Sequence, residues 1–166
     1  MPIHYNYVFD NITKTYNFTT KNDILYRVAF VVDETFSSIS NEAIKNVYQL
    51  VIEKVGESIE PFDSRVSCTI EQMIKKFFND VSNSVIYVCS SDDNKELLRF
   101  KVFERWYLKS PHRVVIEKIN RVLQLSLSPN KTHLIYTSLM FHKNNPNKAK
   151  LLEIYENMEK VLNEEK

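Results

Sequence analysis

Glycine is almost absent from this chain: Gly56 stands alone among 166 residues, where average usage is about 7%. Phosphate-binding loops and dinucleotide-binding turns need several glycines, because their backbone approaches the ligand closely and adopts positive φ. With no second glycine near Gly56, neither pattern occurs in the sequence. This absence excludes the P-loop and Rossmann classes of nucleotide-binding protein.

The chain also has no marked excess of one charge, few cysteines and no long apolar run. The 22 Lys and Arg residues are balanced by 21 Asp and Glu residues, so the basic excess typical of nucleic-acid-binding proteins is missing. Cys68 and Cys89 stand in apolar segments and are predicted to be buried free thiols of a reducing compartment. The first residues lack a signal-peptide pattern, and the longest apolar stretch, 24–32, contains Arg27 and is too short to span a membrane. We therefore expect a cytoplasmic protein.

Apolar residues, by contrast, are plentiful. The chain is 43% hydrophobic and 12% aromatic, which is typical of a globular protein with a sizeable core. Its length is close to the commonest domain size, and no linker, repeat or low-complexity run divides it. The sequence therefore predicts a single domain over residues 1–166.

The N-terminal third is predicted to form antiparallel strands. Aromatic and polar residues alternate along 4–9 and along 16–19, with turn-forming residues after each segment. A better-buried strand is expected over 24–32, because β-branched and aromatic residues dominate there. The segment 41–55 fits both a helical and a strand period. We favour a helical turn followed by a strand from Val47, and a helix remains the alternative.

A helix is expected from Thr69, because Thr69 and Gln72 have capping-box spacing before an apolar stripe. The stripe consists of Ile70, Met73, Ile74, Phe77, Phe78 and Val81. The wholly apolar run 85–89 follows and predicts a central strand covered on both faces.

The C-terminal half is predicted to hold two helices around a strand pair. The first helix runs from Lys95 to about Leu108, after several possible N-cap residues over 90–94, and ends before Pro111. Strands over 119–127 and 134–141 are joined by a turn at 129–130. The last helix carries an apolar stripe made of Leu151, Ile154, Tyr155, Met158, Val161 and Leu162.

This order of elements resembles the core of the GNAT superfamily of acyl-CoA N-acyltransferases, over roughly residues 13–142. In that superfamily the loop after the fourth strand holds the cofactor pyrophosphate, and the resemblance places this loop at 63–68, before the helix at Thr69. It implies an α+β fold with a single mixed, mostly antiparallel sheet flanked by helices. It also makes Arg65 and Thr69 candidate anion-binding residues.

The functional residues of the superfamily carry over only in part. The loop 63–68 contains no glycine. Asn94 matches the residue that often begins the second helix, but Lys101 stands where its general-acid tyrosine is expected. The resemblance therefore implies a degenerate, non-acetylating relative. We predict no cofactor and no measurable affinity for acetyl-CoA.

A second set of residues resembles a small bacterial family catalogued only as a domain of unknown function. The recurring features are Asp63-Ser64-Arg65-Val66, Thr69-Ile70, Ile86-Tyr87-Val88-Cys89, Asp92 or Asp93, Arg99, Phe103, Arg105-Trp106-Tyr107 and Asn145-Pro146. They span most of the chain. This resemblance implies no particular activity.

Arg99 is the most unusual residue of the predicted helices, because it falls inside an apolar face between Phe103 and Trp106. A buried guanidinium needs a carboxylate nearby, since an unpaired buried charge is costly. Its candidate partners are Asp92, Asp93 and Asp63. We interpret this cluster as a structural ion pair that joins two helix entries, with an anion-binding or catalytic site as the alternative.

No metal site and no catalytic residue are predicted. The four histidines, His4, His112, His133 and His142, show no ligand spacing. A nucleophilic cysteine is activated by a histidine, and neither cysteine has a histidine near it in the sequence.

Three classes of function follow from these observations. The leading hypothesis is a non-catalytic cytoplasmic protein-interaction module, such as one half of a toxin–antitoxin or defence pair. The first alternative is a GNAT-like acyltransferase with an atypical cofactor loop, and the second is a nucleic-acid-associated factor. The expected partner is another protein rather than a membrane or a nucleic acid.

Overall fold

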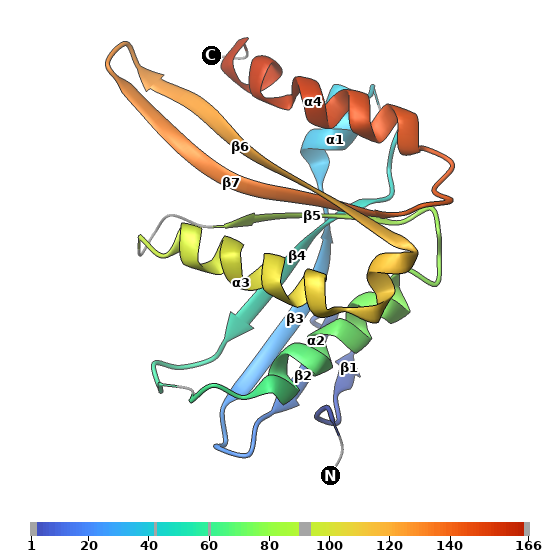
Figure 1. Ribbon diagram of the computed structural model, residues 1–166, viewed down its shortest axis with the longest axis vertical. Coiled ribbons are helices and arrows are strands. Elements are labelled where there is room, and N and C mark those ends of the chain that lie inside the picture. The colour runs from blue at the N-terminus through green and yellow to red at the C-terminus, as the bar shows by residue number, and fades with distance from the viewer. Residues whose placement is uncertain (1–2, 42, 60, 90–93, 165–166) are drawn as a thin grey trace.

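The computed structural model describes residues 3–41, 43–59, 61–89 and 94–164. In these ranges the chain is an α+β protein with one seven-stranded sheet and helices on both faces (Figure 1). The predicted fold class is thereby confirmed. The elements are β1 (Val8–Asp10), β2 (Thr15–Thr19), β3 (Leu25–Val32), α1 (Glu34–Ile39), β4 (Val47–Lys54), α2 (Ser64–Phe77), β5 (Ser84–Cys89), α3 (Glu96–Lys109), the 3-10 turn η1 (Pro111–Val114), β6 (Ile116–Ser128), β7 (Lys131–His142) and α4 (Lys148–Glu164).

The sheet has the strand order β1-β2-β3-β4-β5-β7-β6. Neighbouring strands are antiparallel except β4 and β5, which are parallel. This central pair is short: Val47–Gln49 pairs with Ser84–Ile86, and the register goes no further. Beyond that point the two strands diverge, as Figure 1 shows. The sheet is therefore open in its middle, at the carboxyl ends of β4 and β5.

One face of the sheet is covered by α1 and α4. The apolar stripe of α4 packs on β5, β6 and β7, and it includes Leu151, Ile154, Tyr155 and Met158, all buried. Leu139 and Phe141 of β7 meet these side chains from the sheet and are fully buried. The last helix and its apolar stripe are thus confirmed.

The opposite face is covered by α2 and α3. Helix α2 buries Ile70 and Met73 against β2 and β3, together with Val28. Phe77 stacks on Phe30 with ring centroids 4.0 Å apart, so the predicted packing of this stripe over the sheet is confirmed for most of its length. Val81 lies beyond the end of α2 and is exposed, which corrects that member of the stripe.

The segment around residue 40 differs from the prediction. The strand from Val47 is confirmed as β4, but the helical turn lies earlier, in α1. Asp33 begins α1, because its carboxylate accepts a hydrogen bond from the Phe36 amide at 2.9 Å, and Phe36 is fully buried. An N-cap with a single buried aromatic residue makes too short a pattern for periodicity to detect.

Helix α2 begins at Ser64, five residues before the predicted start at Thr69. Asp63 is the N-cap and accepts from the Arg65 amide at 2.9 Å. Thr69 lies inside the helix, fully buried, where its hydroxyl donates to the Arg65 carbonyl at 2.6 Å and accepts from the Tyr5 amide at 2.8 Å. The capping box at Thr69 was therefore wrong, and residues 64–68 are helix rather than loop.

Two further boundaries are corrected. The first strand is β1, at Val8–Asp10, and does not extend back to residue 4. Helix α3 is confirmed within a residue of its predicted ends, but its N-cap, Lys95, makes no side-chain capping bond. The predicted capping residues 90–93 lie outside the described residues. Within those that are described, no helix is both long and apolar enough to span a membrane.

Candidate functional site

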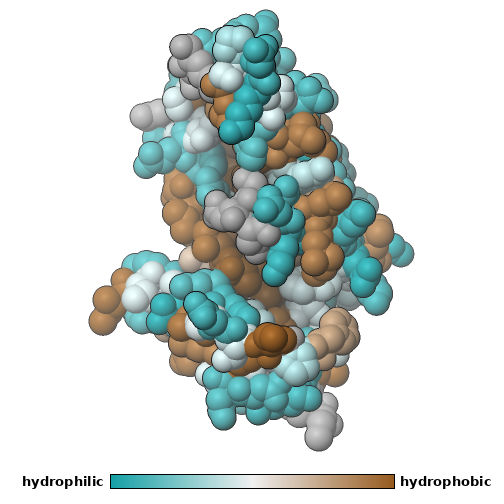
Figure 2. All heavy atoms as spheres, turned by 90° about the vertical axis from the view of Figure 1, so that its left-hand side faces the viewer, coloured by the Kyte–Doolittle hydropathy of each residue, from teal (hydrophilic) through white to brown (hydrophobic). Residues whose placement is uncertain are grey.

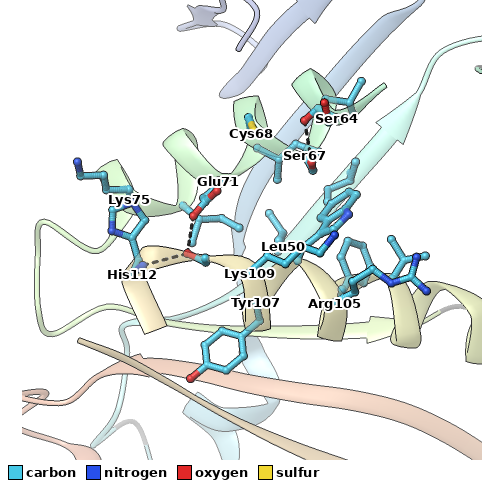
Figure 3. A pocket seen from close by; sticks show the side chains of 18 of the residues that line it. Leu50, Ser64, Ser67, Cys68, Glu71, Lys75, Arg105, Tyr107, Lys109 and His112 are labelled. Carbon is cyan, nitrogen blue, oxygen red and sulfur yellow. Dashed lines mark hydrogen bonds between the residues drawn. The ribbon is translucent and has the colours of Figure 1, made fainter. Parts of the chain in front are cut away.

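A cleft of about 600 Å³ lies between α2 and α3, above the place where β4 and β5 diverge. Its walls come from the facing sides of the two helices (Figure 3). Leu50 and Ile52 of β4, with Tyr87 of β5, form part of its floor. Figure 2 looks toward the open side of the sheet and shows apolar side chains gathered in the hollow between the upper and lower parts of the molecule.

Helix α3 forms one wall because its apolar residues pack against the core without being fully buried in it. Phe103, Trp106 and Tyr107 line the cleft and are only half-buried, and no residue of α3 is buried. The C-terminal end of α3 is tied to the middle of α2, because the hydroxyl of Ser110 donates to the carboxylate of Glu71 (Figure 3). The cleft is therefore an unfilled layer between helix and sheet, whose two walls a hydrogen bond holds together.

The rim of the cleft is basic. Lys75, Arg105, Lys109 and Arg113 line it and are exposed. The acidic residues lining the cleft already have partners, since Glu71 accepts from Ser110 and Asp63 accepts from Tyr5. The rim therefore favours a ligand that carries negative charge beside its apolar parts.

A polar group of side chains lies under α3 at the inner end of the cleft. The ammonium of Lys118 donates to the carboxylate of Glu104 and to the Asn120 amide oxygen, the latter at 2.5 Å. Its side chain is 1% exposed. Burial lowers the pKa of Lys118, and its hydrogen bond to Glu104 opposes that shift. Burial acts to raise the pKa of Glu104, but the hydrogen bonds from Lys118 and Asn120 outweigh it and leave that pKa lowered.

Aromatic rings enclose this ion pair. The Lys118 ammonium lies 5.6 to 5.7 Å from the ring centroids of Tyr87, Phe100 and Tyr107, which is cation–π distance. Burial raises the pKa of Tyr87, against a smaller opposite effect of the Ser138 hydroxyl across the strand pair. Tyr87 and Lys118 both line the cleft. The floor thus combines an apolar surface with two buried polar groups.

The candidate anion-binding residues lie at the start of α2, in a cluster with Tyr5. The Tyr5 hydroxyl donates to Asp63 at 2.5 Å and accepts from the Arg65 guanidinium at 2.6 Å. The guanidinium also stacks over the Tyr5 ring, 4.1 Å from its centroid. The hydrogen bond from Tyr5 holds the pKa of Asp63 below its usual 3.8, against the effect of burial. Together with the buried Thr69, these contacts tie the N-terminal segment to α2.

The predicted charge cluster of Arg99, Asp92, Asp93 and Asp63 stays a prediction, because only two of its four members lie among the described residues. Asp63 bonds to Tyr5 and Arg65, whereas Arg99 is a half-buried residue of α3. Asp92 and Asp93 lie outside the described residues, so their pairing with Arg99 stays a prediction. The positive charge of Arg99 acts on Cys89, where burial is the larger influence and raises the thiol pKa to about 11.

The two cysteines differ in burial, and the metal-binding residue types do not cluster in the described part of the chain. Both cysteines are free thiols, as predicted, but only Cys89 is buried, whereas Cys68 is half-buried and lines the cleft. In the part of the chain that the structure describes, no group of three or more His, Cys, Asp or Glu side chains is placed to hold a metal ion.

Sequence reasoning missed the cleft and the polar floor beneath it. Lys118 and Asn120 face α3 because β6 alternates its side chains, yet nothing in the local pattern distinguishes them from solvent-facing residues. Only the position of α3 over the sheet buries the Lys118 side chain, while Asn120 stays exposed at the margin of this group. The signal present in the sequence is Trp106-Tyr107 next to Phe103, an aromatic cluster larger than one helix face needs.

Comparison with known proteins places the chain in a family without an assigned activity. The model of DUF6169, a family of unknown function, matches residues 62–159, and the chain belongs to this family. The match begins at the mouth of the cleft and runs into α4, so it contains α2, α3 and the polar floor. No curated protein and no solved structure matches the chain. The likeness to the GNAT superfamily and the toxin–antitoxin role therefore stay predictions.

Proposed function

We propose that this member of DUF6169 is a non-catalytic protein-interaction module that binds an extended segment of a partner protein in the cleft between α2 and α3. The two free cysteines suit a cytoplasmic setting. The proposal is carried by one observation, the divergence of β4 from β5 beneath two helices that do not close over the gap.

The divergence leaves two strand edges facing each other. Beyond Gln49 and Ile86 the register between β4 and β5 ends, while β4 still pairs with β3 and β5 with β7. Unpaired strand edges inside a sheet are a template for an added strand. An extended peptide satisfies them with its own amide groups, the mode of recognition known as β-augmentation.

The apolar walls of the cleft supply the complementary driving force. A segment with apolar side chains buries Phe103 and Trp106, which α3 leaves half-exposed. Phe62 stands at the mouth and is 92% exposed, so it is free to cover the bound segment. Burial of aromatic surface of this kind dominates the energetics of most peptide interfaces.

The charges on the rim define the partner further. Lys75, Arg105 and Lys109 are exposed around an apolar groove. They favour acidic side chains flanking the apolar ones in the partner segment. The start of α2 argues against a phosphate-bearing ligand, because the Asp63 carboxylate already caps the helix amide that a phosphate would use.

A second candidate function is binding of an acyl-pantetheine arm, as in the GNAT superfamily. The observation that favours it is the parallel pair β4 and β5 opening next to α2, which agrees with the order of elements on which the resemblance rests. The arm also carries amide groups that suit strand edges. The capped start of α2 and the absence of glycine before it weigh against this candidate.

The test is a selection of random peptides displayed on phage against the wild-type chain. We expect the selected peptides to combine apolar and acidic residues, and to slow hydrogen exchange of amides in β4 beyond Gln49 and in β5 beyond Ile86. Because the peptide binds the cleft of the folded chain and not the unfolded chain, a saturating concentration of peptide raises the melting temperature by mass action. The blocking variant Ser67→Trp, on the cleft face of α2, should abolish binding without unfolding the chain.

A matched pair of exposed residues provides the control. Phe62→Ala should weaken peptide binding by about 5-fold or more, the loss typical of an aromatic anchor. Ile12→Ala removes an equally exposed residue at 93%, in the turn between β1 and β2, and should leave binding unchanged. Peptides that bind Ser67→Trp as tightly as wild type would rule out the cleft as their site.

Calorimetry with acetyl-CoA separates the two candidates. We expect no measurable heat of binding at micromolar protein concentration. Micromolar affinity that is lost in Ser67→Trp would instead favour the acyl-pantetheine candidate over the peptide.

A further inference from the structure

We propose that the floor of the cleft is a carboxamide-binding site, in which the Tyr87 hydroxyl donates a hydrogen bond to the carbonyl oxygen of an uncharged amide. In a partner segment that group is the side chain of Asn or Gln. The inference rests on the proposed function, because it assigns the chemistry of one point in the same cleft.

The Tyr87 hydroxyl is a buried polar group that lacks a partner. Tyr87 is 4% exposed and lines the cleft, yet no described residue forms a hydrogen bond with its hydroxyl. Its neighbour across the strand pair, Ser138, donates its own proton to Asn120 at 2.7 Å and acts on the pKa of Tyr87, but no hydrogen bond of ordinary geometry joins the two hydroxyls. Buried polar groups in native proteins are nearly always satisfied, so an orphan beside a cavity calls for a partner from the solvent or from a ligand that enters the cavity.

The other tyrosine at this floor shows the contrast. Tyr107 lines the same cleft, but its hydroxyl donates to the Ile116 carbonyl at 2.9 Å. The need for an external acceptor is therefore specific to Tyr87.

The local charge balance selects an uncharged acceptor. The Lys118 ammonium lies 5.7 Å from the centroid of the Tyr87 ring, and Glu104 already neutralises it. A carboxylate placed here would bring a second negative charge into the buried pair, and an ammonium would bring a second positive charge. Either would be buried without a counterion, which is strongly unfavourable. A carboxamide satisfies the Tyr87 hydroxyl without adding charge.

Aromatic side chains shape the space around the acceptor. The Phe103 ring lies 4.8 Å from the Tyr87 ring, and Trp106 packs edge-on to Phe103 at 5.3 Å. These residues come from α3, whose side chains all remain partly exposed. A flat, uncharged group attached to an apolar body is the chemistry that this arrangement accommodates.

The experiment uses the full chain with ¹³Cζ-labelled tyrosine and four small probes of one shape: benzamide, toluene, benzoate and benzylammonium. Each is titrated while the Tyr87 signal is followed by NMR. We expect benzamide to bind more tightly than the other three and to shift the Tyr87 signal. Tyr87→Phe should weaken benzamide binding by about 3- to 10-fold, the net effect of one hydrogen bond, and leave toluene unchanged.

Tyr107→Phe is the matched control, because it removes a hydroxyl from the same cleft that already has a partner, and benzamide affinity should not change. Equal effects of Tyr87→Phe on benzamide and toluene would overturn the proposal. Tighter binding of benzoate or benzylammonium than of benzamide would also overturn it, and so would a failure of all four probes to bind. The two proposals fail in different ways, because the probes bind without a peptide. If benzamide binds as expected but the phage selection yields no peptide, only the interaction module is contradicted. If peptides are selected and Tyr87→Phe leaves their affinity unchanged, only the carboxamide site is contradicted.

Discussion

Helices α3 and α4 lie on opposite faces of the same sheet and are similar in length, 14 and 17 residues, but they are packed very differently. Helix α4 buries Leu151, Ile154, Tyr155 and Met158. Helix α3 carries Phe100, Phe103, Trp106 and Tyr107 and buries none of them completely. The difference is not one of apolar content. It arises because α3 rests on the paired strands β5 and β7 with one side only, while its other side lines the cleft above the opening between β4 and β5.

The comparison indicates that the α4 face of the sheet contributes mainly to folding stability, whereas the α3 face is suited to binding. The α4 face is a closed core in which each apolar side chain contributes to folding. The α3 face keeps its aromatic side chains partly accessible to solvent. These side chains therefore stabilise the fold less than they would if they were buried. A face of that kind is the natural place for a ligand, since the ligand completes the missing layer.

The largest expected effect comes from truncating the α4 core. Leu151→Ala should lower the free energy of unfolding by about 2–5 kcal/mol, the range for a fully buried leucine. Val102→Ala, in the cleft wall of α3, should cost roughly 1 kcal/mol or less, because that side chain is only half-buried and leaves no new closed cavity. Urea unfolding of both variants measures the difference. Equal losses would mean that α3 is as firmly packed as α4.

An intermediate effect is expected from two buried tyrosines, one on each face. The Tyr155 hydroxyl is bonded to Thr137 at 2.8 Å and donates to the Ile119 carbonyl at 3.3 Å. Tyr155→Phe should therefore cost about 1 kcal/mol. Tyr87→Phe removes a hydroxyl that has no partner among the described residues, so stability should stay the same or rise. Thermal unfolding of the two variants side by side tests this, and a clear loss in Tyr87→Phe would show that its hydroxyl is satisfied.

The smallest effect concerns the two helices on the cleft face, of which α2 has a side-chain cap and α3 has none. The hydrogen bond from Tyr5 lowers the pKa of Asp63. A carboxyl group with a lowered folded-state pKa stabilises the fold above about pH 3.8, and this contribution is lost as the pH falls through the folded-state value.

Asp63→Asn should consequently lower stability slightly at neutral pH and make it less sensitive to acid. Asparagine still caps the helix, so the fold is retained. Urea unfolding at several pH values from 3 to 7 measures both effects. An unchanged acid dependence would show that Asp63 has no such role.

Much of this protein could be predicted from local sequence patterns. The apolar run 85–89 became β5, although Val88 is 50% exposed, so the prediction that both faces are covered was wrong at that residue. The stripe of Leu151, Ile154, Tyr155 and Met158 became the buried side of α4. Side-chain periodicity indicates which face of an element turns toward the core, but it does not decide how completely that face is buried, as the half-buried face of α3 shows. The scarcity of glycine likewise excludes whole classes of phosphate-binding site, because those sites depend on backbone conformations that other residues rarely adopt.

Only the tertiary structure decided what Asp63 and Thr69 contact and what the cleft contains. Asp63 caps α2 locally through the Arg65 amide, but Tyr5, far away in sequence, donates its hydroxyl proton to Asp63 and its amide proton to Thr69. The buried state of Lys118 and the missing partner of Tyr87 depend on how α3 rests on β5, β6 and β7, next to the point where β4 and β5 diverge. Strand divergence is set by the packing of distant elements, and no local period in the sequence records it.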